Sequence, residues 1–342
     1  MRSGKKSTTA TGLGGKQAKL SLWKRLLRGT LVVAIAVVLL LLILLGIILV
    51  PNLLAQLEGK ISTKTIQQDQ ITRSYRVYRP THVLPHPGLV IMLSGETSGI
   101  VQEIGTNFDA QADRLGWIVV YPEILSEGWD AYGCCPHQGA SDVAFISSVI
   151  DQLETTERVD PNRVYISGIS RGGMMAYRLG CELSTRIAAI APVAGNMADQ
   201  NGHVQGIACH PQHPVSVLAI HGTADPEVPL QGGKSLVQQE SIAYAPFNDV
   251  IAKWREIDHC GSARSVTRSG SPMTTWMCQG GSVVSTLVIP GGVHTWPGTL
   301  LGVLVGVVSS GPQSYGPEVS INASQIIADF FAAHQRVQVG VV

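Results

Sequence analysis

The chain has 342 residues, with 25 Lys and Arg against 24 Asp and Glu, which gives a formal net charge of +1. Charged residues make up 14% of the sequence and hydrophobic residues 45%, whereas an average globular protein has about 25% charged residues. This composition excludes a disordered chain, a coiled coil and a nucleic-acid-binding protein with a basic surface. It is compatible with a membrane protein.

The balanced charge hides an uneven distribution along the chain. Residues 1–29 contain eight basic residues and no acidic residue, so the rest of the chain carries 17 basic against 24 acidic residues. The sequence therefore predicts a basic N-terminal tail over residues 1–29, followed by a larger acidic part.

Residues 31–50 form an apolar run that contains neither a charged residue nor a proline. A helix of this length covers about 30 Å, the thickness of the hydrocarbon core of a bilayer. We therefore expect a transmembrane anchor over residues 30–50, with the tail in the cytoplasm and the remainder extracytoplasmic, periplasmic or at the cell surface. The alternative is a cleaved signal peptide, which would make the protein secreted, but the apolar run exceeds the usual length of its core.

Residues 51–70 are polar and predict a linker, and residues 71–342 predict a single catalytic domain. Apolar runs of strand length recur at 89–93, 117–121, 164–166, 215–220 and 286–289, and residues 75–79 alternate like a half-exposed strand. Helical patterns lie between or after them, at 141–153, 171–183 and 323–334. This alternation predicts an α/β fold with a mostly parallel central sheet flanked by helices.

The strongest motif is the G-x-S-x-G run Gly168-Ile169-Ser170-Arg171-Gly172. It follows a predicted strand and opens a predicted helix, which is the strand–turn–helix context of a nucleophile elbow. A helix that begins at this turn directs its main-chain amides toward the site where an oxyanion forms. Ser170 is therefore the candidate nucleophile.

A serine nucleophile needs a histidine base and a carboxylate that orients it. Asp225 and His294 each lie in a loop just beyond a predicted strand, where α/β sheets place their sites. The order Ser, Asp, His is that of α/β-hydrolases, so the sequence predicts this fold. Asp199 and Asp249 are weaker candidates for the acid. His221 is expected to have a structural role.

Two main-chain amides are expected to form the oxyanion hole. One is that of Arg171, directly after the nucleophile, and the other is that of Glu96, in the loop after the strand at 89–93. Because a carboxylate would repel the oxyanion, we expect the Glu96 side chain to turn away.

The chain has six cysteines, which suggests disulfides in a protein outside the cytoplasm, although six cysteines allow 15 pairings. A zinc site is the less favoured interpretation of these cysteines. No Cys-x-x-Cys pair occurs, and Pro85 lies between His82 and His86, where it disfavours the helix that would align them. We therefore expect neither a metal nor a cofactor.

These motifs and several further segments resemble the polyhydroxybutyrate depolymerase and feruloyl esterase family of α/β-hydrolases, close to family 1 carbohydrate esterases. The matching segments are Trp129–Cys135, Asp142–Ile146, Asp160–Ala176, Ala191–Gly195, His221–Asp225, Val228–Gly233, Gly291–Gly298 and Ile327–His334. The resemblance covers about residues 72–336. It implies a secreted or periplasmic serine esterase with the triad Ser170, Asp225 and His294. One departure is Ser94-Gly95, where the family commonly has His-Gly, and it bears on the oxyanion role of Glu96.

The resemblance also implies disulfide pairs and a substrate pocket. The implied pairs are Cys260–Cys278, Cys181–Cys209 and the adjacent Cys134–Cys135, and for the last pair free thiols are the alternative. Trp129 and Trp296 are candidates for lining the substrate pocket. The apolar loop 298–311 predicts either core packing or a hydrophobic flap over the acyl pocket or against the membrane.

The sequence as a whole predicts a serine esterase that forms an acyl-enzyme from hydroxybutyrate, feruloyl or acetyl esters. A serine peptidase of the same fold and a catalytically silent binding module are the alternatives. The expected partners are the ester substrate and the membrane, through residues 30–50, and no nucleic acid. Neither the acyl group nor the oligomeric state follows from the sequence.

Overall fold

The computed structural model describes residues 60–336 except 69, 127, 133–140, 200, 237–241 and 300–319, together with isolated positions between 30 and 58. The chain divides into two compact units, Met1–Leu57 and Glu58–Val342. The account below concerns the second unit, except where residues 30–50 are named.

The prediction of a transmembrane helix over residues 30–50 is wrong. In the part of the chain that the structure describes, no helix is both long enough and apolar enough to cross a bilayer. Several residues of the stretch lie outside the described residues. The single-pass membrane anchor, its cytoplasmic N-terminus and the membrane-anchored localisation that rested on this span are corrected with it.

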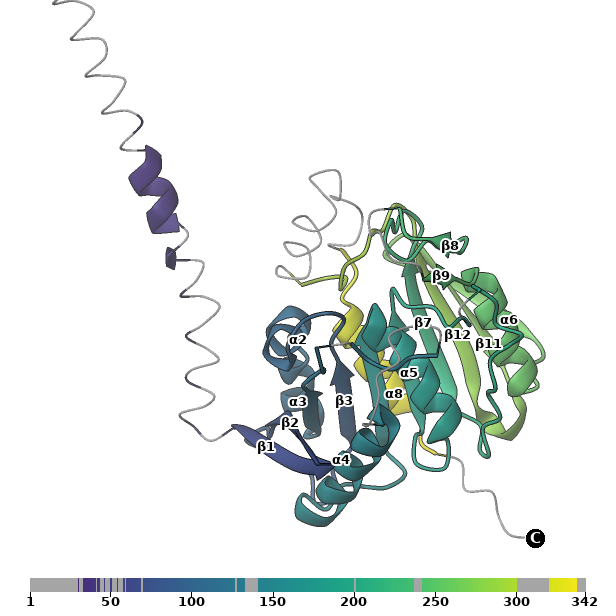
Figure 1. Ribbon diagram of the computed structural model, residues 1–342, viewed down its shortest axis with the longest axis horizontal. Coiled ribbons are helices and arrows are strands. Elements are labelled where there is room, and N and C mark those ends of the chain that lie inside the picture. The colour runs from purple at the N-terminus through teal and green to yellow at the C-terminus, as the bar shows by residue number, and fades with distance from the viewer. Residues whose placement is uncertain are drawn as a thin grey trace, which may run out of the picture. The chain divides into compact units, whose positions relative to one another are not determined.

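A ten-stranded sheet forms the centre of the second unit, in the order β1-β2-β4-β3-β5-β6-β7-β12-β11-β10 (Figure 1). Its strands are β1 (Ile61–Gln68), β2 (Ile71–Tyr78), β3 (Leu89–Leu93), β4 (Ile118–Pro122), β5 (Val164–Ile169), β6 (Ala189–Val193), β7 (Ser216–Gly222), β10 (Ala263–Arg268), β11 (Ser271–Met277) and β12 (Val283–Ile289). The strands from β4 to β12 in this order are parallel, and antiparallel strands flank them at both edges. A separate two-stranded sheet pairs β8 (Gly233–Lys234) with β9 (Ala243–Tyr244). The predicted α/β-hydrolase fold with a mostly parallel sheet is therefore present.

Strand β1 lies within the stretch that the sequence predicts as a linker, residues 51–70. It pairs along its whole length with β2, with Ile61 opposite Tyr78 and Gln68 opposite Ile71. Most of its side chains are exposed, so the strand lacks the apolar pattern by which a buried strand is recognised.

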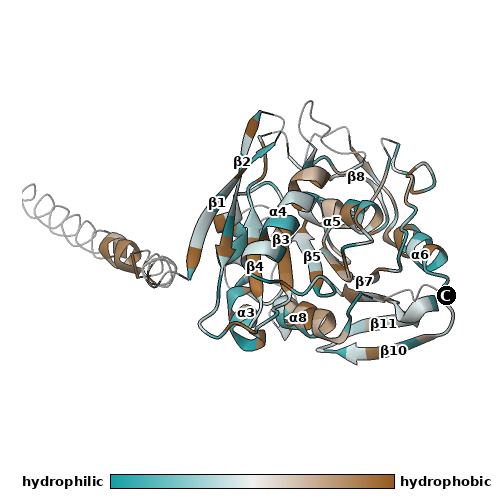
Figure 2. Cartoon of the chain, turned by 90° about the horizontal axis from the view of Figure 1, so that it is seen from below, coloured by the Kyte–Doolittle hydropathy of each residue, from teal (hydrophilic) through white to brown (hydrophobic). Residues whose placement is uncertain are grey.

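Helices cover both faces of the sheet. They are α2 (Gly99–Thr106), α3 (Asp109–Leu115), α4 (Asp142–Thr156), α5 (Arg171–Glu182), α6 (Phe247–Ile257) and α8 (Ala323–Ala333), with a 3₁₀ turn at Gln279–Gly281. Figure 2 shows α3 and α8 side by side on one face, with α4 and α5 on the other. The side chains of Ser141 and Asn322 accept hydrogen bonds from the amides of Ala144 and Gln325, which caps α4 and α8.

The central strands are buried on both faces, as the apolar residues gathered there in Figure 2 indicate. Every residue of β3, β4, β6 and β7 is buried. On one face, Tyr165 of β5 stacks between Trp117 and Phe331 of α8, with ring centroids 5.2 and 4.7 Å apart. On α5 and α6, Tyr177 and Trp254 stack in the same way at 6.1 Å.

Among the described cysteines, two disulfides are formed, Cys181–Cys209 and Cys260–Cys278. The first joins the end of α5 to a loop, and the second joins the end of α6 to the end of β11. Such bridges restrict the unfolded chain and are typical of proteins that fold in an oxidising compartment. Cys134 and Cys135 lie outside the described residues.

We expect Phe331→Ala to lower the free energy of unfolding by about 3–5 kcal/mol, because it leaves a cavity beneath Tyr165 in a fully buried stack. Urea unfolding followed by circular dichroism measures the loss. Gln325→Ala is the matched control, since this side chain is exposed on the same helix and should change stability by about 0.5 kcal/mol or less. Equal losses for the two variants would contradict the importance of the stack.

Candidate active site

Ser170 occupies a sharp turn between β5 and α5. Its backbone has φ 57° and ψ −123°, a strained conformation for a residue with a side chain, and it is the N-cap of α5. The amide of Ser170 donates to the carbonyl of Val193 at 2.9 Å, which fixes the turn against the end of β6. This is the geometry of a nucleophile elbow, which presents its side chain at the carboxyl end of the sheet.

The glycines of the motif are required by a close approach of the neighbouring turn. A Cβ at Gly172 would lie 2.4 Å from the carbonyl oxygen of Leu93, and one at Gly168 would lie 2.7 Å from the same atom. A Cβ at Gly95 would lie 3.2 Å from the Cβ of Ser170. The loop after β3 therefore packs directly against the turn that carries Ser170.

Asp225 and His294 meet at the ends of two neighbouring strands. Asp225 follows β7 and His294 follows β12, and these two strands are parallel neighbours in the sheet. The Nδ1 atom of His294 lies 2.9 Å from Oδ2 of Asp225, and the two residues are 8% and 4% exposed. The carboxylate can therefore fix the tautomer of the imidazole and leave Nε2 for proton transfer.

The local turn holds Asp225 in its ionised form. Its Oδ1 accepts hydrogen bonds from the amides of Glu227 and Val228, both at 2.9 Å. Burial opposes ionisation, but the charge and hydrogen bond of His294 outweigh it and keep the pKa of Asp225 below its ordinary value.

The pKa of His294 lies above its ordinary value. Burial is the largest single influence and would lower this pKa, but the charge and hydrogen bond of the Asp225 carboxylate, together with the charges of Glu227 and Glu96, outweigh it. Glu227 is the nearer of the last two, with Oε2 3.6 Å from Nε2 of His294. The sequence analysis did not single out Glu227, and only its place two residues after Asp225 could have drawn attention to it.

His221 supports the acid rather than replacing the base. It is buried, its Nε2 lies 2.8 Å from the carbonyl oxygen of Val228 and 3.5 Å from Oδ2 of Asp225, and its ring packs near Phe247. Burial lowers the pKa of His221 below its ordinary value and so favours the neutral ring. The Nε2–H can then donate to the loop that carries Asp225.

Ser170 and His294 line one cavity of about 130 Å³. Its described lining residues are Gly95, Glu96, Thr97, Val101, Gln102, Gly105, Thr106, Ile169, Ser170, His294, Thr295 and Trp296. The loop after β3, helix α2 and the segment after β12 thus form its walls. The predicted pocket residue Trp296 lies in this lining.

Trp129, the second tryptophan predicted for the pocket, is not among these lining residues. It is fully buried, and its Nε1 donates to the carbonyl of Ser94 at 2.8 Å. Trp129 therefore supports the loop after β3 from behind.

The two residues predicted for the oxyanion hole pair through their side chains. Nη2 of Arg171 lies 3.0 Å from Oε1 of Glu96. This ion pair engages the Glu96 carboxylate and brings the two main-chain segments together beside Ser170.

The weaker acid candidates lie apart from this arrangement. Asp199 accepts hydrogen bonds from the amides of Asn201 and His203 in its own turn, and Asp249 is exposed in the first turn of α6. Most of the predicted apolar loop 298–311 lies outside the described residues, because residues 300–319 are not among them. Across the residues that the structure does describe, no group of three or more His, Cys, Asp or Glu side chains could hold a metal ion.

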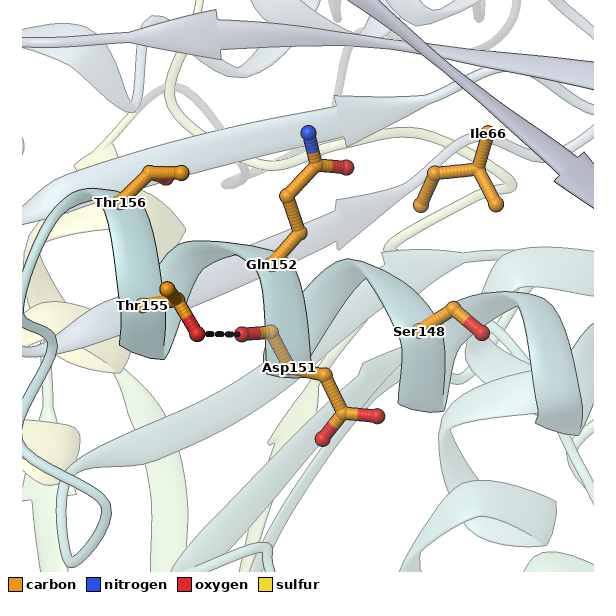
Figure 3. A pocket seen from close by; sticks show the side chains of 6 residues that line it. All are labelled: Ile66, Ser148, Asp151, Gln152, Thr155 and Thr156. Atoms are coloured by element: carbon orange, nitrogen blue, oxygen red, sulfur yellow. Dashed lines mark hydrogen bonds between the residues drawn. The ribbon is translucent and has the colours of Figure 1, made fainter.

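A larger and more open hollow lies between β1 and α4 (Figure 3) and has a volume of about 480 Å³. Its polar side chains have partners within the protein: Thr155 donates to the carbonyl of Asp151, the Asp151 carboxylate pairs with Arg186, and Gln152 accepts from Tyr75. Its described lining contains no histidine and no nucleophile beside a base. The cavity at Ser170 is therefore the candidate active site.

Comparison with known proteins places the chain in a family. Residues 73–209 match the family described as Esterase PHB depolymerase. A protein of Nocardia uniformis subsp. tsuyamanensis that carries the name putative esterase NocK is 31% identical over 252 residues, which cover 66% of this chain and 71% of NocK. A protein of Neocallimastix patriciarum named bifunctional acetylxylan esterase/xylanase is 28% identical over 233 residues, which cover 65% of this chain and 31% of that protein.

The chain thus spans about a third of the length of the Neocallimastix relative. Among solved structures, the acetyl xylan esterase from Aspergillus awamori matches with a TM-score of 0.51 and 14% sequence identity, over 68% of this chain and 94% of that one. At this identity the likeness concerns the fold. From the family match and the relation to NocK, the chain belongs to the polyhydroxybutyrate depolymerase type of esterases, a family of carboxylic ester hydrolases.

Proposed function

We propose that the chain is a serine esterase that hydrolyses carboxylic esters with Ser170, Asp225 and His294. The observation that carries the proposal is that Ser170, on a strained elbow, shares a cavity with His294, whose Nδ1 is hydrogen-bonded to Asp225. Nucleophile, base and acid come from three strand ends at one edge of the sheet, which is the arrangement that acyl transfer requires.

The reaction proceeds in two steps. Ser170 attacks the ester carbonyl while His294 takes its proton, and Asp225 stabilises the imidazolium that forms. The amides of Arg171 and Glu96 donate to the oxyanion, and His294 then protonates the leaving alcohol. A water molecule, deprotonated by His294, attacks the acyl-enzyme and releases the acid.

The size of the cavity favours short acyl groups. At about 130 Å³ it is smaller than the roughly 150 Å³ cavity that holds a benzene molecule. We therefore place acetyl and hydroxybutyryl esters before feruloyl esters. This order is tested by measuring kcat/KM for p-nitrophenyl, feruloyl and hydroxybutyrate esters and for a peptide substrate. Faster cleavage of the feruloyl ester or of the peptide would contradict it.

We expect Ser170→Ala to reduce kcat for ester hydrolysis by about 10⁶-fold, the usual loss for a triad nucleophile. Ser167→Ala is the matched control, since Ser167 lies in the same strand and its hydroxyl only donates to the carbonyl of Ala191. Labelling by a fluorophosphonate probe gives a second readout and should disappear only in Ser170→Ala. Unchanged hydrolysis by that variant would exclude Ser170 as the nucleophile.

We expect Asp225→Asn to reduce kcat by about 10⁴-fold, because the amide no longer orients His294 in the required tautomer. Asp199→Asn removes a carboxylate that serves its own turn and should retain activity. Steady-state kinetics of both variants on one p-nitrophenyl ester decide the assignment. A loss of kcat in Asp199→Asn but not in Asp225→Asn would assign the acid to Asp199.

We expect Glu227→Gln to move the acid limb of the kcat/KM profile to lower pH. His294 must be neutral to accept a proton, so kcat/KM rises as pH passes through its pKa. The Glu227 carboxylate helps to raise that pKa, and its removal should lower it. Glu256→Gln, at an exposed position at the end of α6, changes the net charge equally and should leave the profile in place. A shift to higher pH in Glu227→Gln would refute this role.

A further inference from the structure

The peptide between Ser94 and Gly95 marks the point where the loop after β3 enters the wall of the cavity. Ser94 is fully buried and is not among the described lining residues, whereas residues 95–97 line the cavity. A Cβ at Gly95 would lie 3.2 Å from the Cβ of Ser170, so this peptide lies directly beside the candidate nucleophile. Its orientation therefore determines how the next main-chain groups enter the site.

The carbonyl oxygen of Ser94 is held by a tryptophan. Nε1 of Trp129 donates a hydrogen bond to this oxygen at 2.8 Å, and both residues are fully buried. Helix α5 approaches the same oxygen, since a Cβ at Gly172 would lie 2.5 Å from it. Because a trans peptide is planar, a fixed Ser94 carbonyl also fixes the direction of the Gly95 amide, which points the opposite way.

The backbone beside Trp129 is held in turn by a buried ion pair. Nη2 of Arg73, on β2, lies 2.9 Å from Oδ1 of Asp142, on α4, and the two side chains are 1% and 0% exposed. Oδ2 of Asp142 accepts a hydrogen bond from the amide of Asp130 at 2.8 Å. The Cζ atom of Arg73 also lies 5.9 Å from the centre of the Trp129 ring. Desolvation cancels much of the stability that a buried ion pair could give, so its main effect here is to hold this backbone in place.

The other side of Asp130 is bound by the helix that begins at the candidate nucleophile. Nη1 of Arg178, on α5, donates to the carbonyl oxygen of Asp130 at 2.6 Å and lies 3.0 Å from its carboxylate. The loop after β3 and helix α5 therefore share one anchor, which consists of Trp129 and Asp130.

We propose that Trp129 is a positioning residue for the oxyanion hole: its indole N–H holds the Ser94 carbonyl so that the amide of Glu96 is presented to the oxyanion. This inference rests on the proposed esterase function and on the two amides assigned to the oxyanion there. Trp129 acts through Ser94, because it is buried outside the described lining of the cavity. A displaced donor weakens binding of the transition state more than binding of the ester, so Trp129 acts on kcat rather than on KM.

Trp129→Phe tests the proposal, because it removes the indole N–H and keeps an aromatic ring. Trp254→Phe is the matched control: Trp254 is also fully buried, but its Nε1 has no hydrogen-bond partner among the described residues, so the same change breaks no such bond. Both variants are made in the full chain, and kcat and KM are measured with p-nitrophenyl acetate. The inhibition constant of butylboronic acid is measured as well, because this compound forms a tetrahedral adduct with a serine nucleophile and so resembles the transition state.

We expect Trp129→Phe to lower kcat by about tenfold or more and to leave KM within about twofold, since loss of a whole oxyanion donor costs about 10²–10³ in kcat. The inhibition constant of butylboronic acid should rise by about the factor by which kcat falls, because the adduct uses the same donors. Trp254→Phe should change kcat and this constant by less than about twofold, because it leaves the donors in place. If Trp129→Phe does not fold, replacement of Trp129 by 3-benzothienylalanine, which exchanges the N–H for sulfur at nearly the same shape, gives the same readouts.

Two results would overturn the role of Trp129 and leave the esterase function standing, provided that hydrolysis still depends on Ser170. One is an unchanged kcat and an unchanged inhibition constant in Trp129→Phe. The other is an equal loss in Trp254→Phe, which would assign the effect to the core in general. Hydrolysis by the unaltered chain no faster than that by Ser170→Ala would overturn the esterase function and this inference together.

Discussion

The candidate site depends on the close packing of two turns, the one after β3 and the one after β5. With no side chain at Gly168 or Gly172, the carbonyl of Leu93 can approach the turn that carries Ser170. This approach sets Gly95 against the nucleophile and Glu96 beside Arg171, and it directs α2 along the wall of the cavity. A methyl group at either glycine would separate the turns by at least several tenths of an ångström, more than catalytic geometry tolerates.

The second determinant is the field of carboxylates around His294. Asp225 contacts Nδ1, Glu227 lies 3.6 Å from Nε2, and the charge of Glu96 adds to theirs. Burial would otherwise favour the neutral ring, so the pKa of His294 reflects a balance between desolvation and three negative charges. In the proposed reaction, the same charges favour the imidazolium form of His294 and disfavour anionic substrates near the site.

The sequence could predict features that depend on short segments of the chain, and it could not predict features that depend on contacts between distant segments. The α/β order, the elbow at Ser170 and the succession of Asp225 and His294 follow from strand ends and turn residues, which are local patterns. Strand β1 was missed because its exposed side chains show no apolar alternation, and the membrane span was predicted from apolar length alone. The contact of Glu227 with His294 and the supporting place of Trp129 depend on contacts between distant segments, which no spacing along one chain reveals.

Helix α8 closes the cavity from far along the chain, since the hydrogen bond between Ser324 and Thr106 joins residues 218 positions apart. The same hydroxyl accepts a hydrogen bond from the indole of Trp296, so Ser324 connects α2 to the segment after β12. During synthesis, the part of the chain that contains Ser170 is made well before the two hydrogen bonds of Ser324 can form. A nascent chain therefore contains the candidate nucleophile before the contacts that α8 makes beside the cavity can form.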